Sequence, residues 1–145
     1  MDKIRVKKLH PNAIIPTSGS LDAAGADLYA CIDGDMTIAP GQTVFVPTGI
    51  AMEIPKGYAG FVYARSSLGS KRGLAPANKV GVIDSDYRGQ IMVALHNHGT
   101  EAQTLSPCDR IAQIVIAPVF TPGFEEAEDL DDTVRGTGGF GSTGK

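Results

Sequence analysis

Cysteine is scarce in this sequence, which has only Cys31 and Cys108 and no C-x-x-C pair. A small secreted domain held together by disulfides needs more cysteines than this, so we expect a reducing compartment and interpret both residues as small apolar side chains of the core. A chain of 145 residues fits one domain, and at this length it buries roughly two-thirds of the surface that its unfolded form exposes.

Positive charge is also limited, because 13 lysines and arginines stand against 16 acidic residues and give a formal charge of −3. Proteins that bind duplex nucleic acid carry a basic excess that neutralises phosphates. We therefore exclude nucleic acid as a partner, and any phosphate that the protein binds must be held by a local group of side chains.

Long hydrophobic runs are missing as well. No segment approaches the ~20 apolar residues of a membrane span. The N-terminal sequence MDKIRVKKLH has neither the apolar core nor the cleavage site of a signal peptide. We expect a cytoplasmic protein with no membrane partner.

Long helices and internal repeats are not indicated either. Eighteen glycines and nine prolines are spread along the chain and leave little room for long helices, and the absence of a repeat of roughly 20 to 50 residues excludes a solenoid or a propeller. What is present instead is a series of short runs with period-two alternation or with clustered β-branched and aromatic side chains. These runs are Ile4 to Lys7, Val44 to Val46, Ile50 to Ile54, Phe61 to Tyr63, Ile91 to Leu95 and Ile111 to Val119. Separated by turn dipeptides, they predict an all-β sandwich or barrel.

One short helix is predicted after Arg65, where Ser66 or Ser67 can cap a turn from Leu68 to Arg72 that stops at Gly73. Free backbone N–H groups at the helix start, two hydroxyls and a guanidinium together favour a phosphate site. The alternative is an ordinary helix cap beside a surface arginine.

The composition divides the chain into a β domain over residues 1–120, an acidic linker over 121–134 and a glycine-rich arm over 135–145. An extended linker of this length spans roughly 45 Å, far enough to reach a neighbouring subunit. In the arm, Arg135 and the flexible backbone suit phosphate oxygens, and the isolated Phe140 suits stacking on a base. The match of Gly139 to Lys145 with a P-loop is incidental, because no helix follows the lysine. A solvated, disordered tail is the alternative.

The segment from Asn78 to Gln90 is predicted to be a strand, a tight turn with two acids and a returning strand. Asp84 follows an apolar run, where partial burial would raise its basicity and let it take a proton from water. The alternative is a turn aspartate that hydrogen-bonds its own backbone. Asn78 and Tyr87 are placed to flank a base and a sugar.

His96 and His98 lie on one face of a predicted strand. No acid or cysteine joins them at a recognisable ligand spacing, and zinc sites need three or four donors. We therefore interpret them as a surface pair on an edge strand rather than as a metal site.

Five segments, in this order along the chain, resemble the five motifs of the trimeric dUTP pyrophosphatases, the dUTPase family. They are AAGADLYA at 23–30, ARSSLG at 64–69, NKVGVIDSDYRG at 78–89, CDRIAQIV at 108–115 and RGTGGFGSTG at 135–144. The resemblance spans nearly the whole chain. It implies a jelly-roll-like all-β homotrimer that cleaves dUTP into dUMP and pyrophosphate, with each active site drawing on all three subunits.

The resemblance also implies roles for individual residues. Asp84 would activate the water that attacks the α-phosphorus. Asp27 would support nearby Arg65 and, through water, a Mg²⁺ ion held chiefly by the phosphates. The uracil and the deoxyribose would be bound by Asn78, Gly81, Val82, Ile83, Tyr87 and Met92. The phosphates and the closing arm would involve Arg65, Ser66, Ser67, Gln113, Arg135, Phe140, Gly141, Ser142 and Thr143.

Two positions depart from the family pattern. Cys108 stands where glycine is usual and disfavours a turn that requires positive φ, and Ala64 stands where proline often precedes Arg65. Two other classes remain open at this point. One is a dCTP deaminase, which shares the scaffold but needs a glutamate at the base, and the other is a noncatalytic trimer whose nucleotide-controlled arm binds a protein partner. Asp84 and Tyr87 in the segment IDSDYRG favour the dUTPase.

Overall fold

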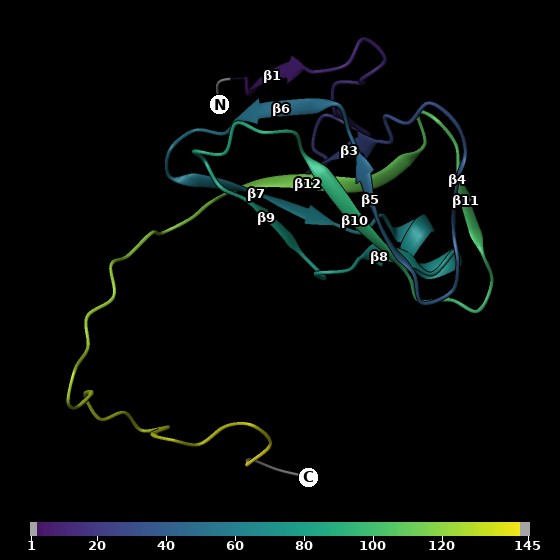
Figure 1. Cartoon of the computed structure of the whole chain (residues 1–145). Helices are drawn as coiled ribbons and strands as arrows, with labels where there is room; N and C mark the ends of the chain where they lie inside the picture. Colours follow the sequence, from purple (N-terminus) through teal and green to yellow (C-terminus); the bar gives the residue numbers. More distant parts are fainter. Residues whose placement is uncertain (1–2, 143–145) are drawn as a thin grey trace.

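The computed structural model describes residues 3–142 and is almost entirely β structure (Figure 1). The strands are β1 (Arg5–Lys8), β2 (Thr17–Ser18), β3 (Gly25–Tyr29), β4 (Met36–Ile38), β5 (Thr43–Pro47), β6 (Ile50–Glu53), β7 (Tyr58–Tyr63), β8 (Leu74–Pro76), β9 (Gly81–Ile83), β10 (Met92–Asn97), β11 (Gln103–Leu105) and β12 (Arg110–Pro118). One short helix, η1 (Ser67–Lys71), lies between β7 and β8. The predicted fold class, all-β with one short helix, is confirmed.

The strands form two main antiparallel sheets and two separate pairs. The five-stranded sheet has the order β2-β3-β12-β7-β9, and the three-stranded sheet has the order β5-β10-β8. In addition, β1 pairs with β6 and β11 pairs with β4. The longest strand, β12, has nine residues and lies between β3 and β7 at the centre of the larger sheet. It therefore brings together segments that are far apart in the sequence.

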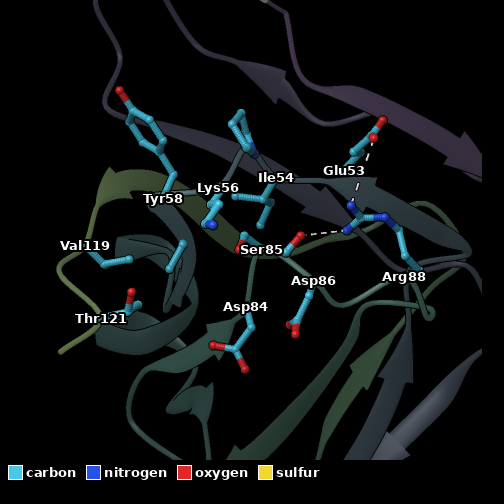
Figure 2. A pocket seen from close by; sticks show the side chains of 13 residues that line it. Glu53, Ile54, Lys56, Tyr58, Asp84, Ser85, Asp86, Arg88, Val119 and Thr121 are labelled. Atoms are coloured by element: carbon cyan, nitrogen blue, oxygen red, sulfur yellow. Dashed lines mark hydrogen bonds and ion pairs between the residues drawn. The ribbon is translucent and has the colours of Figure 1, made fainter. Parts of the chain in front are cut away.

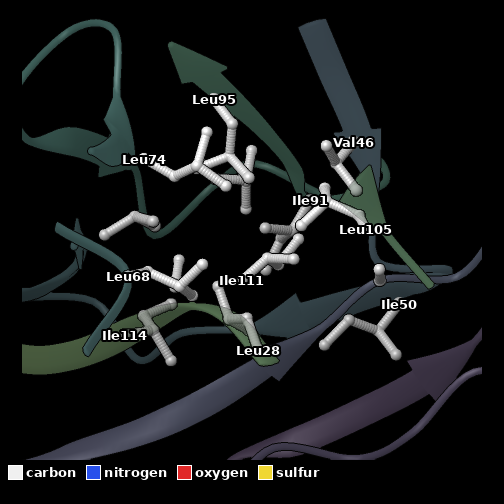
Figure 3. Packing of buried hydrophobic residues seen from close by; sticks show 14 of the residues in the cluster. Leu28, Val46, Ile50, Leu68, Leu74, Ile91, Leu95, Leu105, Ile111 and Ile114 are labelled. Carbon is white, nitrogen blue, oxygen red and sulfur yellow. The ribbon is translucent and has the colours of Figure 1, made fainter. Parts of the chain in front are cut away.

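The core is built from one face of each main sheet (Figure 3). Ile91, Val93 and Leu95 are each at most 2% exposed, as their alternation predicts, because every second residue of a strand points to the same side. Leu28 and Ile114 from the larger sheet belong to the same cluster. Burial of a side chain of this size contributes about 1.5–3 kcal/mol, so this cluster fixes which face of the larger sheet remains exposed to solvent.

The helix forms where the sequence predicts it, but it is not capped as predicted. Ser66 already has helical dihedral angles (φ −55°, ψ −44°) and makes no side-chain cap, because a capping residue needs an extended conformation to aim its oxygen at the first N–H groups. Instead, the Ser70 hydroxyl donates to the Ser66 carbonyl. Gly73 follows the helix with φ 65°, the left-handed conformation that commonly ends helices.

The linker and the arm leave the β domain and extend away from it (Figure 1). The Val119 N–H donates to the Gly57 carbonyl at 2.9 Å, and beyond it residues 120–137 are all exposed. The apolar side chains of Phe124, Leu130 and Val134 are each at least 88% exposed. Over residues 3–142, no helix is long and apolar enough to cross a membrane.

Candidate functional site

A row of polar side chains crosses four neighbouring strands of the larger sheet. Asp27 on β3 lies opposite Thr17 on β2 and opposite Gln113 on β12, which in turn lies opposite Tyr63 on β7. Directly opposed residues point to the same face of a sheet. Because the next residue, Leu28, points into the core, this row occupies the outer face.

Asp27 is the acid at the centre of this row, and two arginines contact its carboxylate. Arg65 Nε donates to Oδ1 at 2.8 Å, and Arg110 Nη1 lies 3.4 Å from Oδ2. The side chains of Asp27 and Arg65 are 17% and 23% exposed, so solvent and salt screen this pair less than a surface pair. Asp27 therefore fixes the direction of the Arg65 guanidinium, whereas Arg110, at 55% exposed, is held more loosely.

Arg65 and Arg110 line a cleft of 460 Å³ that lies beside the end of β7 and the start of η1. Its lining residues are Arg65, Ser67, Leu68, Lys71, Arg72, Asp109 and Arg110. Four cations and one acid make this cleft positive in a chain whose formal charge is −3. Guanidinium and ammonium groups in this arrangement suit several phosphate oxygens at once.

Sequence reasoning missed three of these cations, Lys71, Arg72 and Arg110. The guanidinium of Arg72 donates to Gln103 Oε1 at 2.9 Å and to the Thr104 carbonyl at 2.6 Å, so β11 fixes its position from a distant part of the chain. For Lys71 and Arg72, the only local signal is that they form a basic pair at the end of a predicted helix. Such a pair equally well complements the negative end of the helix dipole.

Gln113 holds the backbone beside Arg65. Its Nε2 donates to the Ala64 carbonyl at 2.9 Å, which ties β12 to the residue just before the guanidinium. Gly25 leaves room for this side chain, because a Cβ added at Gly25 would lie 2.5 Å from Gln113 Oε1. Ser66 and Ser67, also assigned to phosphates by the resemblance, are both exposed at the start of η1.

The segment from Asn78 to Gln90 is not the paired hairpin that the sequence predicts. β9 pairs with β7 in the larger sheet, whereas β10 pairs with β5 and β8 in the smaller one. The turn therefore crosses between two sheets. Close packing favours the pairing of β9 with β7, because Gly81 fits against β7 so tightly that a Cβ added at this residue would lie 3.3 Å from Val62 Cβ.

Asp84 follows β9 and lines a pocket of 650 Å³ together with Lys56, Asp86 and Arg88 (Figure 2). Arg88 also lies 4.0 Å from Glu53. The predicted partial burial of Asp84 is wrong for the single chain, where the residue is exposed, because it lies in a turn beyond the outermost strand of its sheet. Within the described residues the Asp84 carboxylate accepts no hydrogen bond, so it does not simply stabilise its own turn.

One chain does not bring Asp84 to the positive cleft. The register pairs Ile83 with Gly60, so Asp84 lies beside Ala59, and Arg65 follows Ala59 by six residues. At about 3.3 Å per residue, six residues cover roughly 20 Å. A general base must lie within about 3 Å of the water that it activates. Asp84 and Arg65 of the same chain therefore do not act on the same phosphorus.

The residues that the resemblance assigns to the nucleoside lie on β9 and in the turns beside it, except for Met92, which begins β10 in the smaller sheet. Val82, Tyr87 and Met92 are 57%, 45% and 40% exposed, and the Asn78 amide lies beside Gly81. Among the described strands, β9 has β7 as its one partner, so its other edge offers backbone donors and acceptors. The Tyr87 hydroxyl donates to a carbonyl of its own loop at 2.8 Å and so has a fixed ring.

Over residues 135–142, the arm forms its own turns apart from the β domain (Figure 1). Arg135 Nε donates to a carbonyl of its own turn at 2.7 Å, and Ser142 Oγ accepts a backbone N–H at 2.7 Å. Phe140 is fully exposed with φ 50°, and Gly141 follows with φ 82°. Thr143, the last residue assigned to the arm, lies outside the described residues. The arm thus presents its aromatic ring and its cation to solvent.

The histidine pair does not lie on an edge strand as predicted, because β10 lies between β5 and β8. His96 Nδ1 and Thr43 Oγ1 share a hydrogen bond of 2.8 Å, and the rings of His96 and His98 meet edge to face at 4.5 Å. Burial, the neighbouring His96 and Lys79 lower the pKa of His98. In residues 3–142, no group of three or more His, Cys, Asp or Glu side chains is arranged to hold a metal ion.

Comparison with known proteins places these observations in a family. The dUTPase family profile matches residues 11–144. A deoxyuridine 5′-triphosphate nucleotidohydrolase from Syntrophotalea carbinolica is 51% identical over 141 residues, which cover 97% of this chain and 96% of the relative. The dUTPase of Staphylococcus bacteriophage 80alpha, solved with dUPNHPP, has a TM-score of 0.91 at 26% identity and covers 100% of both chains. An aspartate-to-asparagine mutant of the dUTPase of phage phi11 of S. aureus, whose structure coordinates a structural Mg(II) ion, shares the fold with a TM-score of 0.80 at 23% identity, over 88% of this chain and 98% of that one.

Proposed function

This chain belongs to the dUTPase family and hydrolyses dUTP to dUMP and pyrophosphate, and we propose that it does so at a site assembled from three copies of the chain. The observation that carries the proposal is the register of β9 on β7, which places Asp84 beside Ala59, six residues before Arg65. Six residues of extended chain cover roughly 20 Å. In a threefold ring, one surface of each subunit meets a different surface of the next. A neighbour's Asp84 can therefore complete the positive cleft, whose own acid, Asp109, already accepts the Ser106 N–H at 2.8 Å.

In this assembly, the cleft of one copy binds the triphosphate through Arg65, Lys71 and Arg110. The exposed edge of β9 in a second copy binds the uracil with its backbone groups, since an edge strand can pair with the hydrogen-bonding edge of a base. Tyr87 of that copy lies against the deoxyribose and excludes a 2′-hydroxyl. The arm of the third copy stacks Phe140 on the base.

Asp84 accepts the proton of the water that attacks the α-phosphorus, and the bond to pyrophosphate breaks in line. Arg65, aimed by Asp27 at 2.8 Å, neutralises charge on the phosphate oxygens as the transition state forms. Reactions of this kind depend mainly on positioning and charge neutralisation. Subunit contact would also cover Asp84, which is exposed in the single chain, and bring it out of bulk water.

Mg²⁺ is the metal that the residues fit best. The described residues contain no cluster of three ligands, and both oxygens of Asp27 face arginines. This donor set suits an ion held mainly by phosphates and water, as magnesium prefers. When bound, the ion would supply further neutralisation of the triphosphate, and Asp27 would support it through water with its remaining lone pairs.

Mixing two inactive variants tests the shared site. Arg65→Ala removes the cleft's central cation and Asp84→Asn removes the base, and each variant alone should be inactive. After denaturation and joint refolding at equal amounts, we expect about one quarter of wild-type activity. Random trimers of mixed composition each contain one site in which an intact cleft meets a neighbour's intact Asp84.

The matched control refolds each variant with the double variant Arg65→Ala/Asp84→Asn. These mixtures contain no pairing of an intact cleft with an intact base in a neighbour, so they should stay inactive. If the mixture of single variants also remains inactive although native mass spectrometry shows mixed trimers, the site does not combine subunits and the proposal is wrong.

A further inference from the structure

The turn before β12 holds Cys108 in an unusual conformation. The Asp109 N–H donates to the Ser106 carbonyl at 3.1 Å, and Cys108, the third residue of this turn, has φ 68°. The Cys108 N–H donates to the Ala30 carbonyl at 2.9 Å, and the Ala30 N–H donates to the Asp109 carbonyl at 2.8 Å. Cys108 and Asp109 thus both lie opposite Ala30. This arrangement is a β-bulge whose first residue, Cys108, has a left-handed backbone conformation. This turn does require a positive φ at residue 108, although the Cβ of a cysteine disfavours it.

This bulge brings the two cysteines of the chain together. The carbonyl that accepts the Cys108 N–H belongs to the peptide group between Ala30 and Cys31. Cys108 is paired with Ala30, so Cys31 is the residue next to this pair. Disulfides join residues whose Cα atoms are roughly 4.4–6.8 Å apart, and such neighbours of a pair lie in reach of that range. The pKa of Cys31 is raised by burial, then by Asp33 and then by Cys108.

The surroundings of the two thiols differ. Cys108 is exposed and Cys31 is half-buried, so the initial expectation of two core cysteines is wrong for Cys108. The Cys31 sulfur packs against the backbone at Gly49, where an added Cβ would lie 2.7 Å from Sγ. An oxidant from solvent therefore reaches Cys108 first, and Cys31 is placed to react second.

We propose that Cys31 and Cys108 form a reversible disulfide that controls the turn leading to Asp109 and Arg110. With a glutathione disulfide as oxidant, the Cys108 thiolate attacks one sulfur and releases the first glutathione thiolate. The Cys31 thiolate then attacks Cys108 Sγ, breaks the mixed disulfide and releases the second. The two cysteine protons end on two glutathione thiols, so two thiols are oxidised and one disulfide is reduced.

The proposed bond acts on the substrate site through Arg110. This residue follows the turn by two positions, lies 3.4 Å from Asp27 Oδ2 and lines the positive cleft. Closing the bond draws the turn that carries Cys108 toward Cys31, and this movement of the turn shifts Arg110. This step rests on the proposed function. We expect oxidation to raise KM for dUTP about fivefold, the effect of losing one partly exposed charge contact, without lowering kcat.

The experiment equilibrates the native protein in glutathione buffers of defined redox ratio, traps free thiols with iodoacetamide and measures intact mass and linked peptides. We expect a Cys31–Cys108 peptide that disappears with dithiothreitol. Cys31→Ser should instead stop at a glutathione adduct on Cys108, because the second thiol is missing. Oxidised protein that still alkylates at both cysteines, or that carries only glutathione adducts or links between chains, would overturn the disulfide.

Kinetics then test the effect on the site separately from the bond. KM should rise on oxidation in the wild-type protein and stay constant in Cys108→Gly, which suits the turn but cannot be linked. A disulfide that forms while KM stays constant overturns the action on Arg110. Failure of the reduced protein to hydrolyse dUTP would instead contradict the proposed function, and the mass measurement is independent of it.

Discussion

Replacing Gly25 with alanine should move the side chain of Gln113 and weaken the substrate site. The added Cβ would lie 2.5 Å from Gln113 Oε1, and ordinary contacts begin at 3.4 Å. Gln113 therefore rotates away and loses its 2.9 Å hydrogen bond to the Ala64 carbonyl. Such a bond contributes about 0.5–1.5 kcal/mol. We expect the free energy of unfolding to fall by about 1 kcal/mol and KM for dUTP to rise about fivefold, since about 1.4 kcal/mol is tenfold in binding.

The assay combines pyrophosphate release at varied dUTP with unfolding in denaturant. Gly34→Ala is the matched control, because Gly34 has nothing within 4 Å of an added Cβ and no left-handed φ. This control should change neither KM nor stability by more than a few tenths of a kcal/mol, which is typical of exposed substitutions.

A double-mutant cycle separates Gln113 from the strand itself. When Gln113→Ala is already present, the Cβ added at residue 25 no longer has the Gln113 amide to clash with. Adding Gly25→Ala should then have no further effect on KM. If Gly25→Ala raises KM equally in both backgrounds, the effect comes from β3 and the reasoning about the amide is refuted.

Three further changes test other parts of the site. Asp84→Asn should keep nucleotide binding but lower kcat by roughly 10² or more, the range for losing a general base; unchanged turnover at saturating dUTP would contradict that role. Deleting residues 135–145 should leave the trimer intact in light scattering yet abolish most hydrolysis, and a fully active truncation would show that the arm is dispensable. Cys108→Gly should raise the free energy of unfolding, measured in denaturant, by about 0.5–1 kcal/mol. Removing a Cβ from a left-handed residue stabilises the folded state by about 1–2 kcal/mol, and the greater backbone freedom of glycine in the unfolded chain offsets about 0.5–1 kcal/mol of this. A less stable variant would show that Cys108 is not strained.

The part of the fold that local patterns control was predictable, and the part that distant partners control was not. Alternation at Ile91, Val93 and Leu95 predicted a strand with one buried face, because the period of two is a property of the strand alone. The partner of β9 was not predictable, since its close packing at Gly81 depends on β7 rather than on the neighbouring turn. The Ser66 cap failed for a related reason, because its dihedral angles are helical in the folded chain.

The distinction between local patterns and distant partners also holds for the site. The contact of Asp27 with Arg65 was implied by the family resemblance, and the structure shows it at 2.8 Å. Arg110 was missed although it lies within a quoted motif, because its contact with Asp27 depends on the pairing of β12 with β3. Arg72 was missed because β11, which anchors it, is remote in sequence.

The linker indicates when the arm closes over the site. Ordering each linker residue costs about 1–2 kcal/mol of backbone entropy, whereas only a few linker side chains, such as Phe124, Leu130 and Val134, can each recover about 1.5–3 kcal/mol by burial. The acidic residues between these side chains recover little free energy by burial. The linker therefore does not hold the arm closed by itself, and contacts of Phe140 with the base and of Arg135 with phosphate must supply the remainder. In the proposed assembly those contacts form only when nucleotide is bound, so the open arm of the single chain is the expected ground state, and we expect closure in the substrate complex.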